Sequence, residues 1–152
     1  MGMYTGLRFK GYIKKEFRDV FEDIALHGDW GSSSDIRLAS FGDNARASFI
    51  PCGILCYMPD EWEVNPYDYN DSQATDGFNR TYNKETGYWT FQCSLKNYES
   101  EIEEFLNLIP YFIESVEWCE YYYEEWSHSR RYELVDNVMT CTNTKFVEYR
   151  HY

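Results

Sequence analysis

Positive charge is missing from two long stretches of this sequence. Residues 47–79 and 97–129 contain no lysine and no arginine. The whole chain has 26 acidic and 14 basic residues, which gives a formal net charge of −12. A surface this negative repels nucleic acid and anionic lipid, so neither is expected as a direct ligand, and a basic protein surface is the expected partner. Generic solubility is the simpler interpretation of the charge.

Membrane-spanning and secretory segments are missing as well. No apolar run approaches the ~20 residues that cross a bilayer, and no basic start followed by an apolar stretch marks a signal peptide. The five cysteines are an odd number and are expected to be reduced thiols. We therefore expect a cytoplasmic protein.

No catalytic motif is complete. Pro59-Asp60 resembles the opening of the PD-(D/E)xK nuclease pattern, but no D/E-x-K follows it, and the first lysine downstream is Lys84, in a turn. Cys52 and Cys56 are spaced more loosely than the ligands of a zinc knuckle and are expected to be core thiols. We expect no catalytic residue, no metal site and no cofactor, with a metal-dependent hydrolase as the enzymatic alternative.

What the sequence does contain is one long segment with a clear period, residues 100–126. Its apolar side chains recur at three- and four-residue steps, which predicts one helical face packed on the core. They are Ile102, Phe105, Ile109, Phe112, Ile113, Val116, Cys119 and Tyr123. The spacing of Ser100 and Glu103 predicts a capping box at the start, and Pro110 predicts a kink in the middle.

The other segments predict a mixed fold. Expected elements are a strand at 4–13, a helix at 14–26 ended by Gly28, an irregular connection at 28–44 anchored by Ile36, Leu38 and Phe41, a bent strand at 47–58, a hairpin at 81–82 and 88–95, a closing strand at 130–139 and an edge strand at 145–149. The inward positions of the strands are Leu7, Phe9, Ile13, Trp89, Phe91, Cys93 and Leu95.

This order of elements predicts an α+β fold. We expect a ferredoxin-like sandwich, in which two helices lie on one face of a mostly antiparallel sheet. One domain should span residues 1–152, with a long acidic loop at 59–78.

A basic cluster near the start of the chain leaves two interpretations open. Its members are Arg8, Lys10, Lys14, Lys15 and Arg18. They could make a second contact with a partner, or pair with the acids of a neighbouring copy.

Acidic and aromatic residues share the predicted outer face of the long helix and the acidic loop. Large aromatic side chains among acids on a water-facing side are typical of protein-binding surfaces. The acids would supply charge and the aromatics desolvated contact area. The candidate partner-binding residues are Glu103, Glu114, Glu117, Trp118, Tyr121, Tyr122 and Glu125 of the helix, and Asp60, Trp62, Asp68 and Tyr69 of the loop.

In size, charge and this acid-aromatic pattern, the chain resembles the small acidic proteins that phages encode to block host defence nucleases. These are the anti-restriction and anti-CRISPR inhibitors, some of which look like DNA to their targets. The resemblance is one of class and carries over no site residue. It implies a phage-encoded inhibitor in the cytoplasm of the host cell, which evades antiviral defence by occupying the basic nucleic-acid site of a nuclease or effector complex. Two alternatives remain open: an immunity protein that neutralises a nuclease toxin, and an inhibitor that acts allosterically away from that site.

Overall fold

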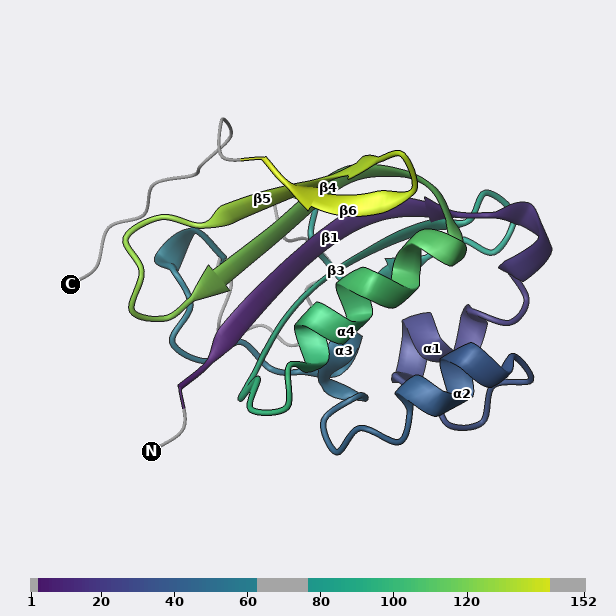
Figure 1. Cartoon of the computed structure of the whole chain (residues 1–152), viewed down its shortest axis with the longest axis horizontal. Coiled ribbons are helices and arrows are strands. Elements are labelled where there is room, and N and C mark those ends of the chain that lie inside the picture. Colours follow the sequence, from purple (N-terminus) through teal and green to yellow (C-terminus); the bar gives the residue numbers. More distant parts are fainter. Residues whose placement is uncertain (1–2, 63–76, 143–152) are drawn as a thin grey trace.

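Six antiparallel strands form the centre of the computed structural model, which describes residues 3–62 and 77–142 (Figure 1). Their order in the sheet is β2-β3-β1-β4-β5-β6. The strands are β1 Thr5–Ile13, β2 Thr81–Tyr82, β3 Tyr88–Leu95, β4 Ile113–Tyr123, β5 Arg130–Val135 and β6 Val138–Cys141. The α-helices are α1 Glu22–His27, α2 Ile36–Phe41, α3 Phe49–Cys52 and α4 Glu101–Leu108, and the 3-10 helices are η1 Lys15–Phe17, η2 Asp60–Trp62 and η3 Ile109–Tyr111.

Helices and one face of the sheet share a single hydrophobic core. In Figure 1, α4 runs alongside β3 and β1, and α1, α2 and α3 lie on the same side of these strands as α4. The predicted α+β class and antiparallel sheet are confirmed. The helices are short and more numerous than the predicted pair, so the finer ferredoxin-like assignment stays a prediction.

The predicted helix over residues 100–126 is wrong beyond its first turns. Only Glu101–Leu108 is α-helical, and the 3-10 turn Ile109–Tyr111 follows directly. Pro110 lies at the start of that turn, where its missing N–H costs no hydrogen bond. The α-helix thus ends just before Pro110, and the chain continues into β4. The kinked helix predicted at Pro110 is therefore wrong.

Two β-bulges in β4 explain why its sequence imitates a helix. Core-facing residues of a regular strand recur at every second position. In β4, Glu114 and Glu117 are extra residues with no register partner on β1, and each moves the next core-facing residue one position further along the chain. The core-facing residues of β4 therefore follow one another at three-residue steps, as Ile113, Val116 and Cys119.

The start of α4 differs from the predicted capping box. Ser100 has a φ of 59° and its side chain makes no capping hydrogen bond. Asn97 takes that role, because its Oδ1 accepts a hydrogen bond from the N–H of Ile102 at 2.9 Å and its Nδ2 donates to Glu103 Oε1 at 2.7 Å. A residue outside the S-x-x-E pattern thus caps the helix.

Between β1 and β2 the chain is less regular than predicted. The expected helix at 14–26 is divided into η1 and α1, although α1 does end at Gly28, whose φ is 66°. The bent strand expected at 47–58 is wrong, because this segment contains the short helix α3 and no strand. Pro51 lies in α3, and a proline cannot donate to a strand ladder.

The connection at 28–44 also contains a helix, α2. Its N-cap is Asp35, whose carboxylate accepts hydrogen bonds from the N–H groups of Arg37 and Leu38. Leu38 and Phe41 are buried as predicted, whereas Ile36 is 80% exposed. Ile36 therefore does not anchor this segment to the core.

The predicted hairpin at 81–95 is confirmed by the antiparallel pairing of β2 with β3. The single closing strand expected at 130–139 is a second hairpin, formed by β5 and β6. Asp136 and Asn137 connect its strands and both have positive φ, 49° and 63°, as a type I′ turn requires. The edge strand expected at 145–149 lies outside the described residues.

Aromatic rings fill the core between helices and sheet. All seven predicted inward residues of β1 and β3 are buried, which confirms their inward positions. Phe9, Trp89, Phe91 and Phe105 contact one another in six ring pairs with centroids 4.8 to 6.2 Å apart. Such pairs contribute about 0.5–1.5 kcal/mol each beyond the area they bury. Phe105 thereby fastens α4 to the sheet.

Two of the five cysteines should be inert in the native protein. Cys93 and Cys119 are fully buried, and burial raises the pKa of both thiols. Because the thiolate is the reactive form, we expect only the partly exposed Cys52, Cys56 and Cys141 to react with a thiol reagent before unfolding. Colorimetric thiol titration before and after denaturation measures this, and rapid native reaction of all five thiols would contradict it.

Candidate protein-interaction surface

The structure separates the predicted partner-binding residues by exposure. Exposed are Glu114, Glu117, Glu125 and Asp60. Half-buried are Glu103, Trp118 and Tyr121. Fully buried are Tyr122 and Trp62, so the exposure predicted for these two is wrong. Asp68 and Tyr69 lie outside the described residues.

The two bulges of β4 supply the exposed acids. Because Glu114 and Glu117 are the inserted residues, each is freed from the register of the ladder and is exposed to solvent. Tyr12 and Tyr88 form a ring pair beside them, with centroids 4.8 Å apart. Burial and then the neighbouring Glu117 carboxylate raise the pKa of Tyr88 to about 12. Glu117 therefore lies next to a pair of half-buried tyrosines.

Trp118 is held inside the structure by its neighbours. The Arg131 guanidinium lies 3.4 Å from the centre of its ring, and Phe78 makes an edge contact at 6.0 Å. Its Nε1 donates to Oε1 of the fully buried Glu120 at 2.9 Å. Trp118 thus supports a buried carboxylate, a structural role that its sequence position did not reveal.

Arg8 is buried on the sheet face opposite the helices. Its guanidinium lies between the rings of Trp62 and Phe78, at 4.6 and 4.3 Å. Its Nε donates to Gln92 Oε1 at 2.9 Å and its Nη2 donates to the carbonyl of Glu61 at 3.2 Å. Both described ends of the acidic loop at 59–78 are therefore anchored on β1.

Other members of the basic cluster have internal partners as well. Lys10 Nζ lies 4.2 Å from the Phe78 ring. Arg18 donates to the carbonyls of Ile13 and Glu85, at 3.1 and 2.8 Å. Arg8, Lys10 and Arg18 therefore contact their own chain. Neither a second partner contact nor pairing with the acids of a neighbouring copy is needed to explain these three residues.

Tyr121 and Glu103 join β4 to α4. The Tyr121 hydroxyl donates to Glu103 Oε2 at 2.7 Å. Burial, followed by the Glu103 carboxylate, raises the pKa of Tyr121. Both residues are used in packing the helix on the sheet, so their availability to a partner is reduced.

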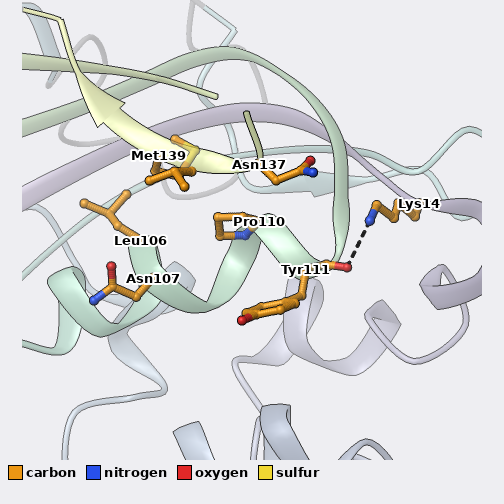
Figure 2. A pocket seen from close by; sticks show the side chains of 8 residues that line it. Lys14, Leu106, Asn107, Pro110, Tyr111, Asn137 and Met139 are labelled. Carbon is orange, nitrogen blue, oxygen red and sulfur yellow. Dashed lines mark hydrogen bonds between the residues drawn. The ribbon is translucent and has the colours of Figure 1, made fainter. Parts of the chain in front are cut away.

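A cleft that was not predicted lies between η3 and the β5–β6 hairpin, with a volume of about 410 Å³ (Figure 2). Leu106, Pro110 and Met139 form its buried apolar part, and Lys14 and Asn137 lie on its polar side. Tyr111 and Val138, both more than half exposed, also line it. Tyr111 stands three residues before Glu114, so the cleft adjoins the acidic end of β4.

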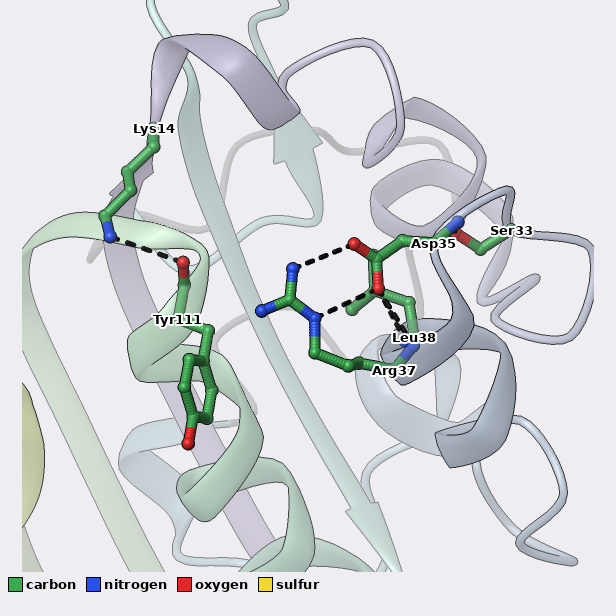
Figure 3. A network of polar contacts seen from close by, with 6 residues as sticks. All are labelled: Lys14, Ser33, Asp35, Arg37, Leu38 and Tyr111. Carbon is green, nitrogen blue, oxygen red and sulfur yellow. Dashed lines mark hydrogen bonds and ion pairs between the residues drawn. The ribbon is translucent and has the colours of Figure 1, made fainter.

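Polar contacts surround Tyr111 (Figure 3). Arg37 forms an ion pair with Asp35 at 3.0 Å, which fixes the guanidinium 5.5 Å from the Tyr111 ring and 4.6 Å from the Phe112 ring. Lys14 Nζ donates to the Tyr111 carbonyl at 3.3 Å. Tyr111 is therefore exposed but held in place, as a contact residue of an interface should be.

Three tyrosines make the fold sensitive to alkaline pH. Burial raises the pKa of Tyr82, Tyr88 and Tyr122 from 10.0 to about 12. Because the pKa is higher in the folded chain, the unfolded chain loses these protons first as the pH rises. The stability they contribute is complete below pH 10 and is lost between pH 10 and about 12.

Urea unfolding at a series of alkaline pH values measures this loss. Tyr82→Phe is the matched variant, because the Tyr82 hydroxyl donates to the Arg18 carbonyl at 2.6 Å only while it is protonated. We expect the variant to lose less stability than the parent over the same pH interval. Equal losses in both proteins would show that Tyr82 ionises freely in the folded state.

Comparisons with protein-family models, with curated proteins and with solved structures found no match to this chain. Within residues 3–62 and 77–142, no three His, Cys, Asp or Glu side chains gather in a way that could hold a metal ion. Over the same part of the chain, no helix combines the length and apolar character needed to span a bilayer.

Proposed function

We propose that this protein is an acidic inhibitor, encoded by a phage and acting in the host cytoplasm, that binds the basic nucleic-acid site of a defence nuclease or effector complex. The observation that carries the proposal is the double bulge of β4, which exposes Glu114 and Glu117 close in sequence to Tyr111, a residue of a cleft with both apolar and polar lining. Acids on a protein surface speed association with a basic groove, and an adjoining apolar surface slows dissociation.

The contact area comes from a different set of residues than the sequence suggested. Tyr122 and Trp62 are buried and Trp118 is packed under Arg131, so none of them is a free anchor. Tyr111 and Val138 are exposed on the cleft that adjoins Glu114. We assign the apolar part of the target contact to these two residues.

The charge part of this proposal predicts a kinetic effect. Changing Glu114, Glu117 and Glu125 together to glutamine should slow association with the target by about tenfold at low salt. The dependence of the association rate on salt should also become weaker, while dissociation changes little. Stopped-flow or surface-based kinetics over a salt series measures both rates. An unchanged association rate would remove these acids from the interface.

Competition tests the mode of inhibition. Purified defence nucleases and effector complexes are titrated with the protein, once free and once loaded with their DNA or RNA. The proposal expects binding to the free enzyme and strongly weakened binding to the loaded one. Equal binding to both would replace occlusion with allosteric inhibition, and binding confined to a nuclease toxin would replace the phage inhibitor with an immunity protein.

We also infer that the strands β2-β3-β1-β4 form a ferredoxin-like unit, to which the β5–β6 hairpin is added. Support comes from the strand order, and from the helical segments that connect β1 to β2 and β3 to β4. This fold carries many unrelated functions, so it adds no weight to the inhibitor proposal.

A further inference from the structure

A second pocket, of about 450 Å³, lies where α3 and the following segment meet the ends of β1 and β3. The residues that line it are Tyr4, Arg46, Phe49, Cys52, Gly53, Ile54, Cys56, Ser94, Leu95 and Lys96. In a chain of net charge −12, this lining contains two bases and no acid. The pocket therefore differs in charge from the acidic surface of β4.

Exposed apolar side chains surround this pocket. Ile54 is 78% exposed, and Phe49 is exposed beside it. Tyr57 contacts the pocket residue Tyr4, with ring centroids 5.7 Å apart. Tyr98 lies 5.0 Å from the guanidinium of Arg46 and is 57% exposed. An exposed apolar patch with polar residues at its border is typical of a protein-binding site.

Both bases of the pocket contact other side chains of the chain. Lys96 Nζ lies 5.8 Å from the Tyr4 ring. Arg46 lies 3.6 Å from the buried carboxylate of Glu101, which offsets part of its charge. Glu124 also lies close, because its carboxylate accepts a hydrogen bond from the Tyr4 N–H. Lys96 therefore supplies most of the positive charge that a ligand would meet.

We propose that this patch, consisting of Phe49, Ile54, Tyr57, Tyr98 and Lys96 around the pocket, is a second docking surface for an acidic, apolar segment of a partner protein. One apolar side chain of that segment would enter the pocket, and its carboxylates would lie beside Lys96 and Arg46. A small ligand could fill 450 Å³ but would leave Tyr57 and Tyr98 uncovered, whereas a protein segment covers them. Tyr4 pairs with Glu124, so this surface lies at the end of β4 opposite Glu114.

Two short peptides test this docking surface. Both carry leucine and phenylalanine at the same positions, and one has glutamate and the other lysine at the remaining positions. Fluorescence anisotropy with the intact protein should show the glutamate peptide binding about tenfold more tightly than the lysine peptide. Equal binding of the two peptides, or no binding of the glutamate peptide, would overturn the proposal.

Matched variants locate the binding. Ile54→Ser and Lys96→Glu should each weaken binding of the glutamate peptide by about tenfold. Their controls, Ile36→Ser and Lys15→Glu, change an isoleucine of equal exposure and an exposed lysine elsewhere, and should leave the affinity unchanged. Arg46 is left intact because its loss would remove the ion partner of buried Glu101. Equal effects in variants and controls would show nonspecific binding.

Sodium hexanoate separates a docking surface from a small-molecule site. The docking surface predicts that hexanoate displaces the glutamate peptide only weakly, because it covers none of the surrounding tyrosines. Displacement by hexanoate at concentrations comparable with those of the peptide would make the pocket a site for small carboxylates and overturn the proposal. These outcomes do not depend on the β4 acids, so they stand apart from the success or failure of the inhibitor proposal.

Discussion

Arg8→Ala is expected to lower the free energy of unfolding by about 3 kcal/mol. The substitution removes the cation between the Trp62 and Phe78 rings. It also removes the hydrogen bonds that Gln92 Oε1 and the Glu61 carbonyl accept from Arg8. A hydrogen bond from a charged donor contributes about 1.5–3 kcal/mol. Urea denaturation followed by tryptophan fluorescence measures the change.

Arg37→Ala is the matched control for this prediction. Arg37 also forms contacts with aromatic rings and a carboxylate, but its side chain is 43% exposed and its ion partner Asp35 lies two residues away. Exposed pairs of this kind contribute about 0–1 kcal/mol. The expected order is therefore a large loss for Arg8 and a small one for Arg37. Similar losses in both variants would mean that the Arg8 environment is solvated.

Tyr111→Ala is expected to speed dissociation from the proposed target enzyme by about thirtyfold, which corresponds to about 2 kcal/mol. Tyr111 is 59% exposed, yet Arg37 lies against its ring and Lys14 holds its carbonyl. A side chain ordered before binding loses little entropy in the complex. The association rate should change little, because the substitution leaves the charge unaltered. Dissociation kinetics of the purified complex measures both rates.

Tyr98→Ala provides the control, since Tyr98 is almost equally exposed at 57% and belongs to the other docking surface. The Tyr98→Ala variant should dissociate from the target enzyme at an unchanged rate, but it should bind the glutamate peptide more weakly. Tyr111→Ala should do the reverse. If both variants affect the enzyme equally, the two surfaces form one interface.

Local patterns in the sequence identified the strands whose alternation is regular. On the core side of β1 and β3 the large apolar residues stand two positions apart, so Leu7, Phe9, Trp89 and Phe91 were assigned correctly, although much of the opposite face is buried as well. The stop at Gly28 was also predicted, because only a residue without a Cβ adopts a φ of 66° there at low cost. Each of these assignments depends on neighbours within a few residues.

The candidate site was harder to predict, because aromatic and acidic residues occur both in the buried interior and on the exposed surface of this protein. Trp118 and Trp62 stand among acids in the sequence, but their contacts are with Arg131 and Arg8, which lie far away along the chain. No local pattern contains such a cation. Glu114 and Glu117 were correctly predicted to face solvent, although on a helix where the structure has a strand.

The sequence by itself determined the net charge of this protein, its high content of aromatic residues, and the inward positions of β1 and β3. Only the tertiary structure decided that residues 113–123 are a strand. The reason is that a bulge changes the side-chain period from two to three, and a period of three is also close to that of a helix. Pairing with β1 resolves this ambiguity, and the same pairing exposes Glu114 and Glu117 and buries Tyr122.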